Sequence, residues 1–392
     1  MTRTLRLAAT TLAIALGAFS LSGCPQPPPD GADLFRVAVN GAPGGSLLSV
    51  WGPADHPGTL YVAGGFVGVD AARLAGTGMS VGRLVEYTTG AFTTRCRTDA
   101  VLWWVHGIPS PTAAPREVWA GGENGTVLRY RDGRCETLPL GLTFPEGAPT
   151  FWGLWAQAPD DVYLVGGSAQ PTGPKGVFVH WDGTRFSRVD VVPTRARTEN
   201  LYKITRVGER YLVVGAANVA FTTNGLGDAR EATTGVSSSD NRIFTAHCRD
   251  VLCMAVGGAA AGFVLRSTSS GADFRVEETV GNGALPGLNG VYIQDPSNMF
   301  AVGTNGFTMH MAQRGFGDVI SYAPPPRTQA TLHGVGGDSV RLMAVGGELD
   351  DRTPMQRTVV LVRGDERDTF TFDGRTYNAL GTLRRSLGGS GQ

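Results

Sequence analysis

The sequence predicts an all-β fold: a single seven-bladed β-propeller of four-stranded antiparallel blades. The first observation is an apolar strand that ends in glycine and returns seven times along the chain. The second is the average spacing of these glycines, 47 residues, which suits one four-stranded blade. The third is composition, because 56 Gly and 23 Pro among 392 residues, without a three-residue period, exclude collagen and favour turn-rich β structure.

The glycine-ended strands set the repeat. They cover residues 60–65, 118–122, 162–167, 211–215, 254–258, 299–303 and 342–347. An apolar run precedes each of them, at 47–51, 102–105, 152–155, 201–204, 243–246, 290–293 and 332–335. Continuous apolar runs suit strands covered on both faces by neighbouring blades, and the glycine permits a sharp exit where a side chain would collide with the next blade. A two-sheet sandwich is the alternative.

The outer half of a blade is also visible in the sequence. Strands at 127–131 and 177–181 are followed by Asp132-Gly133 and Asp182-Gly183, and Asp-Gly supplies the positive φ angles of a two-residue hairpin. An outer strand at 186–191 alternates in polarity, which suits one face in water. Each blade is therefore expected to end in a hairpin at its rim.

Ring closure has two possible solutions. Residues 34–39 look like an outer strand without a blade of its own, and they could complete the last blade as a clasp. Alternatively, 359–363 and 369–372 could supply the last two strands of that blade, with Asp373-Gly374 as a further turn. We favour the clasp. The propeller is then expected at 34–378, with a flexible Arg-, Gly- and Ser-rich tail at 379–392.

The N-terminus has the residue pattern expected of an export signal. Arg3 and Arg6 precede an uncharged apolar stretch at 7–20, and Leu21-Ser22-Gly23-Cys24 follows. This pattern resembles bacterial lipoprotein signal peptides, which implies removal of residues 1–23 and lipid attachment at Cys24. An ordinary secretory signal is the alternative. Residues 24–33 are expected to form a Pro-rich tether. Inner-membrane retention signals of lipoproteins often carry Asp after the cysteine, so by resemblance Pro25 favours the outer membrane, with the domain periplasmic or surface-exposed.

Four further cysteines would lie in an oxidising compartment. Cys248 and Cys253 bracket a short turn between two strands, so we expect a disulfide there. Cys96 and Cys135 remain and are expected to pair by elimination, with free buried thiols as the alternative. No CxxC pair is present, so none of the cysteines indicates a metal site.

Catalytic motifs are absent from the sequence. It contains no HExxH, GxSxG or GxxxxGK[ST], so we assign no catalytic residue, no cofactor and no metal. The six histidines lack metal-ligand spacing and are expected to be structural. Basic and acidic residues balance at 34 each and charged residues make up only 17%, which argues against a nucleic-acid partner.

Two short segments carry a family resemblance. Residues 267–274 (STSSGADF) are similar to an Asp-box, although Ser269 stands where the box has Asp, and 301–306 (AVGTNG) look like a Ycf48-like strand and turn. The sequence thus resembles bacterial BNR/Asp-box and Ycf48-like propellers, and partly kelch propellers, over 34–378. The resemblance implies the fold and hardly constrains activity.

The expected function is binding. Long loops at 66–81, 108–117, 168–175 and 348–357 would gather on the two ends of the ring, where propellers bind partners. We expect a non-catalytic, lipid-anchored module that binds or scaffolds proteins at the cell envelope, with an envelope protein or a cell-surface glycan as partner. The alternative is a glycan-binding protein or sialidase-like glycosidase. An exposed residue of the Trp103-Trp104 pair would suggest a stacking platform.

Overall fold

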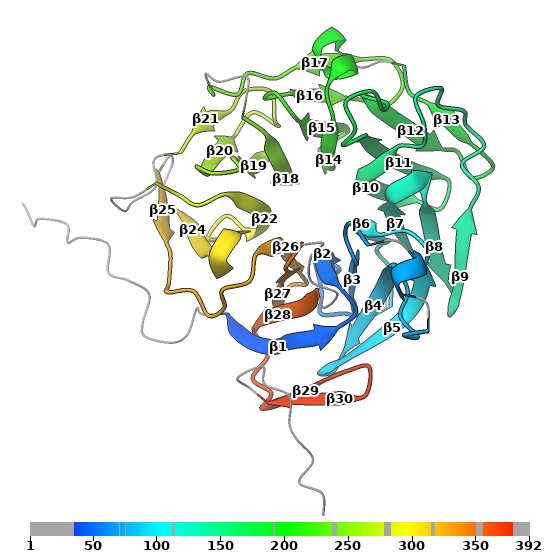
Figure 1. Cartoon of the computed structure of the whole chain (residues 1–392). Coiled ribbons are helices and arrows are strands. Elements are labelled where there is room, and N and C mark those ends of the chain that lie inside the picture. The colour runs from blue at the N-terminus through cyan, green and yellow to red at the C-terminus, as the bar shows by residue number, and fades with distance from the viewer. Residues whose placement is uncertain are drawn as a thin grey trace, which may run out of the picture.

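The computed structural model shows seven sheets arranged around a central axis (Figure 1). It describes residues 35–69, 71–74, 76–111, 114–190, 193–236, 241–277, 284–314, 318–349 and 356–378. The predicted signal peptide, Cys24, the Pro-rich tether and the C-terminal tail lie outside these residues. Among the described residues, no helix has both the length and the apolar character needed to cross a bilayer.

Each sheet contains one blade, and in blades 1 to 6 the four blade strands follow chain order from the axis to the rim (Figure 1). Blade 1 contains β2 (Ser46–Trp51), β3 (Leu60–Gly65), β4 (Gly82–Thr88) and β5 (Ala91–Thr98). Blade 2 contains β6 (Leu102–Ile108), β7 (Glu117–Gly122), β8 (Val127–Arg131) and β9 (Arg134–Leu138). Blade 3 contains β10 (Thr150–Ala158), β11 (Asp161–Gly167), β12 (Val177–Trp181) and β13 (Phe186–Arg188).

The next three blades repeat this plan. Blade 4 contains β14 (Leu201–Val207), β15 (Arg210–Gly215), β16 (Ala220–Thr223) and β17 (Ala229–Glu231). Blade 5 contains β18 (Ile243–Arg249), β19 (Leu252–Gly257), β20 (Phe263–Ser267) and β21 (Arg275–Val276). Blade 6 contains β22 (Leu288–Asp295), β23 (Asn298–Gly303), β24 (Thr308–Arg314) and β25 (Asp318–Tyr322). Short 3-10 turns cover Ala71–Leu74, Glu123–Gly125, Thr194–Thr198 and Thr304–Gly306.

The first strand of the chain closes the ring. Blade 7 contains β26 (Leu332–Gly337), β27 (Leu342–Gly347) and β28 (Arg357–Arg363), and β1 (Arg36–Pro43) pairs antiparallel with β28 as its fourth strand. The clasp is therefore confirmed. The hairpin β29 (Thr369–Phe372) and β30 (Arg375–Asn378) instead extends blade 1, where β29 runs parallel to β5. The expected turn at 373–374 exists, but it belongs to the first blade.

The hydrophobic core lies between the blades. Seven clusters of buried side chains each join two neighbouring blades, and one of them joins blade 7 to blade 1. This arrangement explains the uninterrupted apolar runs, because a strand near the axis is covered on both of its faces. An eighth cluster lies under the loop that follows β3.

The innermost strands share one irregularity. In all seven blades the pairing with the second strand shifts by one residue just after the first apolar residue of the inner strand. A bulge of this kind leaves one residue unpaired and turns its side chain out of the regular alternation.

The ring has two ends. We call the end where the inner strands begin the start face, and the end where they finish the exit face.

The repeated glycines are required by the inner strand of their own blade. A Cβ on Gly166 would lie 2.1 Å from the carbonyl oxygen of Thr150, which begins the inner strand beside it. In the other six blades, a Cβ on the equivalent glycine would lie 1.9–2.2 Å from the carbonyl oxygen just before the first apolar residue of the inner strand. These glycines are Gly64, Gly122, Gly215, Gly257, Gly303 and Gly346. The prediction that these glycines avoid a collision with the next blade is therefore wrong, because the clash is with the inner strand of the same blade. In blade 2 it is Gly122, not Gly121, that occupies the equivalent place.

Substitution of one repeated glycine tests this explanation. Gly166→Ala should lower the free energy of unfolding by about 3 kcal/mol, because the new methyl group meets rigid backbone. Gly227→Ala is the matched control, since its Cβ would have nothing within 4 Å. Denaturant unfolding measures both variants. Equal midpoints for the two would show that the clash is relieved at little cost.

Candidate functional site

The exit face is hollowed at the central axis. A cavity of about 470 Å³ lies there, and the inner strands of all seven blades contribute to its wall. The loop after β2, at 52–56, and residues 109–111 after β6 complete its mouth. The volume falls within the usual range for small-ligand sites. Because every blade contributes, the cavity is a property of the closed ring.

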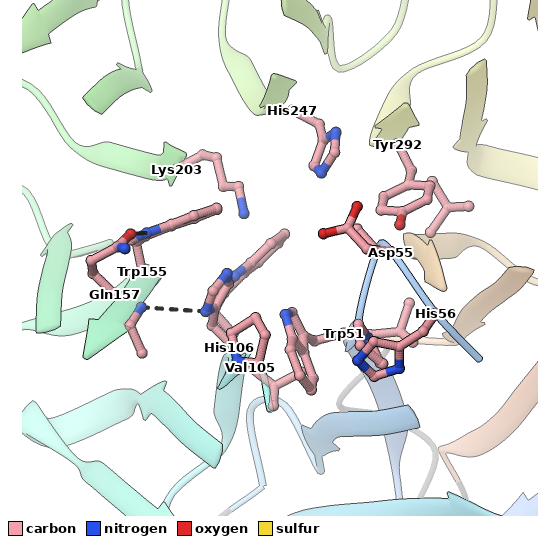
Figure 2. A pocket seen from close by; sticks show the side chains of 18 of the residues that line it. Trp51, Asp55, His56, Val105, His106, Trp155, Gln157, Lys203, His247 and Tyr292 are labelled. Atoms are coloured by element: carbon pink, nitrogen blue, oxygen red, sulfur yellow. Dashed lines mark hydrogen bonds between the residues drawn. The ribbon is translucent and has the colours of Figure 1, made fainter. Parts of the chain in front are cut away.

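Aromatic rings line much of this wall. Trp51, His106, Trp155, His247 and Tyr292 occupy the same register position, four residues after the first apolar residue of their inner strands. Their ring centroids are 5.8 Å apart for Trp51–His106, 4.2 Å for His106–Trp155 and 4.6 Å for His247–Tyr292. Figure 2 shows these side chains around a common space. The cavity therefore offers flat apolar surfaces to a ligand.

The two cavity histidines have a defined hydrogen-bonding state. Nδ1 of His106 accepts the backbone N–H of Ala156 at 3.3 Å, and Nδ1 of His247 accepts that of Ile293 at 3.2 Å. In each case the donor belongs to the next blade. A backbone N–H can only donate, so Nδ1 carries no proton and the proton of the neutral ring resides on Nε2. Each ring therefore presents Nε2–H as a hydrogen-bond donor.

Burial keeps these rings neutral. Desolvation, followed by the positive charge of Lys203, lowers the pKa of His106 and brings that of His247 to about 3. Desolvation also lowers the pKa of His333 to about 4. Histidine in an unfolded chain has a pKa near 6.5. Below that value the unfolded state binds more protons than the folded state.

The resulting pH dependence is a testable prediction. The free energy of unfolding should fall as the pH is lowered from about 7 toward 4, because the buried neutral histidines oppose protonation. His247→Phe should give a shallower decline than the native chain over this window. Denaturant titrations at several pH values measure the difference. Parallel curves for the two proteins would contradict it.

Lys203 is the one lysine or arginine among the described residues of the cavity wall. It lies on β14, is only 4% exposed, and its Nζ stands 3.3 Å from the centroid of the Trp104 ring. Within the described part of the chain it forms no hydrogen bond or ion pair. Desolvation holds the pKa of this amine well below its ordinary value. The side chain therefore carries a burial cost that its contact with the Trp104 ring offsets only in part.

One acidic residue borders the same space. Asp55, in the loop after β2, is the single carboxylate among the described lining residues. Its side chain is 89% exposed and lies 3.4 Å from Arg249 at the end of β18. Glycoside hydrolysis commonly uses two carboxylates facing each other across the scissile bond. The described lining residues do not supply such a pair.

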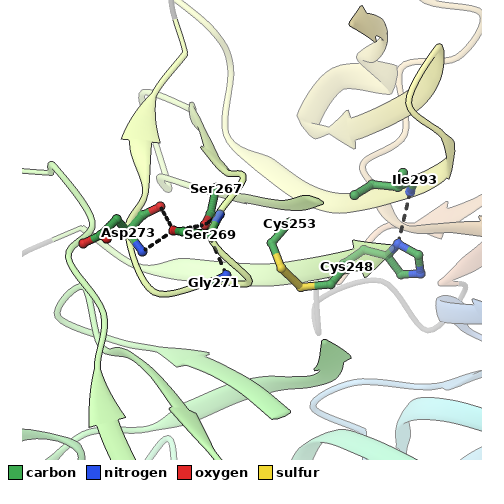
Figure 3. Close-up of a disulfide and its surroundings, with 8 residues drawn as sticks. Cys248, Cys253, Ser267, Ser269, Gly271, Asp273 and Ile293 are labelled. Atoms are coloured by element: carbon green, nitrogen blue, oxygen red, sulfur yellow. Dashed lines mark hydrogen bonds between the residues drawn. A yellow bond between two sulfur atoms is a disulfide. The ribbon is translucent and has the colours of Figure 1, made fainter. Parts of the chain in front are cut away.

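The structure joins both expected cysteine pairs. Cys248 and Cys253 face each other across the β18–β19 hairpin, beside His247 (Figure 3). Cys96 on β5 and Cys135 on β9 join the rims of blades 1 and 2. The first disulfide constrains the hairpin that carries a cavity residue, and the second crosslinks two adjacent blades.

The segment similar to an Asp-box forms a turn between β20 and β21, as Figure 3 shows. Ser267 Oγ accepts the backbone N–H of Ser269 at 3.2 Å and that of Gly271 at 3.1 Å. Ser269 Oγ accepts the N–H of Asp273 at 3.1 Å, and Phe274 is buried beneath the turn. These contacts give the segment a structural role in shaping the turn.

Aromatic side chains also occupy the bulges at the start face. The unpaired residues of four consecutive inner strands are Trp103, Trp152, Tyr202 and Phe244, and all four are half-buried. Ring centroids are 5.4 Å apart for Trp152–Tyr202 and 5.9 Å for Tyr202–Phe244. We call these four residues the aromatic arc. Trp104 points instead toward Lys203, so neither member of the tryptophan pair is fully exposed.

The long loops predicted as binding elements divide unequally. Three loops follow the second strand of their blade and therefore lie on the start face: 66–81, 168–175 and 348–357. The fourth, 108–117, follows the inner strand β6 and lies on the exit face, where it contributes Pro109 and Pro111 to the cavity. Three of the four loops contain residues outside the described ranges.

Sequence reasoning did not identify Lys203, His106 or His247 as cavity residues. A lysine within an apolar inner strand was the available signal.

Comparisons with known proteins support the fold. Neither a family model nor a curated protein matches the chain. A solved structure of Ycf48 bound to a D1 peptide superposes with a TM-score of 0.55 at 12% identity, over 85% of this chain and 97% of that one. Ycf48 from Cyanidioschyzon merolae gives 0.58 at 13%, over 85% and 99%. Because 846 solved chains match, the likeness establishes the propeller and leaves the function to the site.

Metal binding has no support in the described residues. They contain no group of three His, Cys, Asp or Glu side chains placed to hold a metal ion. His180, which is equivalent in its strand to His310, lies 2.8 Å from Asp161 and stacks on Tyr163. Both histidines therefore make local contacts within the blades.

Proposed function

We propose that the protein is a non-catalytic, protein-binding propeller that is anchored by a lipid on Cys24 and works at the cell envelope. The observation that carries the binding role is the aromatic arc. Four half-buried rings from consecutive blades stand at the start of the central channel, each fixed by a bulge in a rigid strand. Aromatic residues are enriched in the cores of protein interfaces, where they contribute much of the binding energy.

Two further points support a protein partner. The similar Ycf48 structure was solved with a D1 peptide bound, so a propeller of this shape can hold a polypeptide segment. In addition, the described wall of the exit-face cavity holds one carboxylate and no arginine, whereas most glycosidases use two carboxylates and a sialidase-like enzyme needs arginines for the substrate carboxylate. The glycosidase alternative therefore gains no support from that site.

Site-specific crosslinking in cells tests the binding role. A photoreactive phenylalanine analogue replaces Phe244 in the aromatic arc, or Val276 on the outer strand β21, which is 47% exposed. We expect a reproducible adduct with an envelope protein from position 244 and none from position 276. The absence of any reproducible adduct, or equal adducts from both positions, would remove the proposal.

A separate measurement tests the anchor. Metabolic labelling with a radioactive fatty acid should mark the native chain, and Cys24→Ala should abolish both the label and sedimentation with membranes. An unlabelled native chain that is exported would instead support the ordinary secretory signal. This outcome would leave the binding role intact, because the aromatic arc does not depend on the anchor.

A further inference from the structure

The cavity in the exit face holds a buried amine that no described residue satisfies. Lys203 is 4% exposed, and its one close polar or aromatic contact in the described structure is the face of Trp104. Trp104 itself has a buried Nε1–H without an acceptor among the described residues. Because buried donors in proteins are normally hydrogen-bonded, an amine and an indole N–H that both lack an acceptor in the described part of one wall call for an explanation outside the fold.

Several other polar groups of the wall are donors, whereas Oε1 of Gln157 already accepts the indole N–H of Trp155 at 3.2 Å. Nδ1 of both cavity histidines is occupied by a backbone N–H, which leaves Nε2–H as a donor on each ring. Tyr292 donates its hydroxyl proton to the carbonyl of Gly337 at 3.2 Å. Asp55, the single acidic lining residue, lies at the mouth beside Arg249. Figure 2 shows Lys203, His106 and His247 directed toward the same space.

We infer that the cavity in the exit face binds a carboxylate, with Lys203 and the Nε2–H groups of His106 and His247 contacting the anion and Trp51, Trp155 and Tyr292 enclosing an apolar body. All three groups line the same cavity and face one space, so they can act on one anion. A carboxylate would complete the hydrogen bonds of the amine at little entropic cost, because the rings are already fixed.

The charge balance favours a carboxylate over a phosphate group. The described wall contains one lysine and no arginine, so it offers at most a single positive charge in a poorly solvated space. A monoanion matches that charge, whereas a dianion would leave an uncompensated buried charge. The aromatic wall adds a preference for a ligand whose remaining atoms are apolar or planar.

Carboxylates of this kind have two sources: a free small acid, or the end or an acidic side chain of a polypeptide. The inference goes beyond the proposed function, because it concerns the opposite face from the aromatic arc. It stands even where no envelope partner is captured by crosslinking. The experiment therefore uses the purified full chain and small probes.

The sequence makes Lys203 easy to observe, because the chain contains only two lysines, Lys175 and Lys203. Protein labelled with ¹³C-lysine should give two Cε signals, which Lys203→Met assigns. Benzoate should shift the Lys203 signal in a saturable manner and leave Lys175 unchanged, and neutral benzamide should shift neither. No shift with any carboxylate probe, or equal shifts with benzoate and benzamide, would overturn the inference.

The peptide arm separates the two sources. Acetyl-Ala-Ala-Phe with a free carboxyl terminus is compared with its C-terminal amide. Tighter binding of the peptide acid than of benzoate indicates a polypeptide terminus, and binding of benzoate alone indicates a free small acid. Either result supports a carboxylate site. Failure of all the acids to bind would contradict it whatever the crosslinking shows.

Matched variants test the role of the amine. Lys203→Met should weaken carboxylate binding at least about tenfold, the usual effect of losing a charge-assisted hydrogen bond. Lys175→Met is the control, because Nζ of Lys175 donates to the carbonyl oxygens of Ser168 and Gln170, away from the cavity. Lys203→Met should also unfold no earlier than the native chain, since it removes an unsatisfied buried amine. Unchanged affinity in a stably folded Lys203→Met would refute the assignment.

Discussion

Removal of residues up to Pro43 should abolish the monomeric folded state. Without β1, strand β28 becomes an uncovered edge and blade 7 keeps only three strands. Phe35 is 4% exposed and Val39 is fully buried, and their burial alone stabilises the fold by about 3–6 kcal/mol. That amount is comparable with the whole net stability of many domains, about 5–15 kcal/mol.

A bare edge strand also pairs readily with other chains. We therefore expect the shortened chain to elute as oligomers in size-exclusion chromatography and to lose its cooperative thermal transition. Addition of a synthetic peptide covering residues 35–43 should recover part of the monomer. A monomeric shortened chain with native stability would show that β1 is not the closing element.

The hairpin at the other end of the chain supplies the matched control. Ending the chain at Arg367 removes β29 and β30, and with them the buried side chains of Phe370 and Tyr377. Blade 1 nevertheless keeps its four strands, β2 to β5. This variant should unfold earlier than the native chain while remaining a monomer. The contrast isolates closure of the ring from simple loss of buried surface.

Arg83 explains why both chain ends meet at one place. It lies on β4 and is 4% exposed; its guanidinium donates to the carbonyl of Pro43 at 3.2 Å and to the hydroxyl of Thr358 on β28. Asp373, in the turn of the terminal hairpin, lies 3.9 Å away. One buried cation thus joins blade 1, the clasp and the terminal hairpin. Sequence patterns along single strands do not reveal such a contact.

The repeat was predictable because it is local. Each glycine-ended strand and its apolar predecessor are read directly from the sequence, and the seven sheets appear where these patterns place them. The clasp was also predictable, since residues 34–39 had no other blade to complete. The position of β29 was not, because its parallel pairing with β5 depends on the tertiary approach of a distant edge.

The cavity was harder to predict for a specific reason. A regular strand alternates its side chains, but every inner strand contains a bulge that breaks this alternation after its first apolar residue. The alternation rule therefore cannot tell which of Trp103 and Trp104, or of Tyr202 and Lys203, lines the cavity in the exit face. The histidine partners are likewise hidden, because their backbone donors belong to the next blade.

Loss of the disulfide between the rims of blades 1 and 2 should be the second large effect. Cys96 and Cys135 are separated by 39 residues, and Cys248 and Cys253 by only 5. The entropy that a crosslink removes from the unfolded chain grows with the loop it closes, to about 4 kcal/mol for the longer loop and about 2 kcal/mol for the shorter. The double variant Cys96→Ser/Cys135→Ser should therefore lose roughly twice as much stability as Cys248→Ser/Cys253→Ser.

Denaturant unfolding without reductant measures both double variants against the native chain. Repeating the measurement with reductant should lower the free energy of unfolding of the native chain by about the sum of the two losses, because the pairs lie in different blades and share no contact.

The comparison of the two variants also bears on the cavity, since only the shorter loop includes the hairpin next to His247. Carboxylate binding should therefore weaken more in Cys248→Ser/Cys253→Ser than in the other variant, although its stability falls less. Equal losses of stability in the two variants would show that loop length does not govern the contribution of these crosslinks.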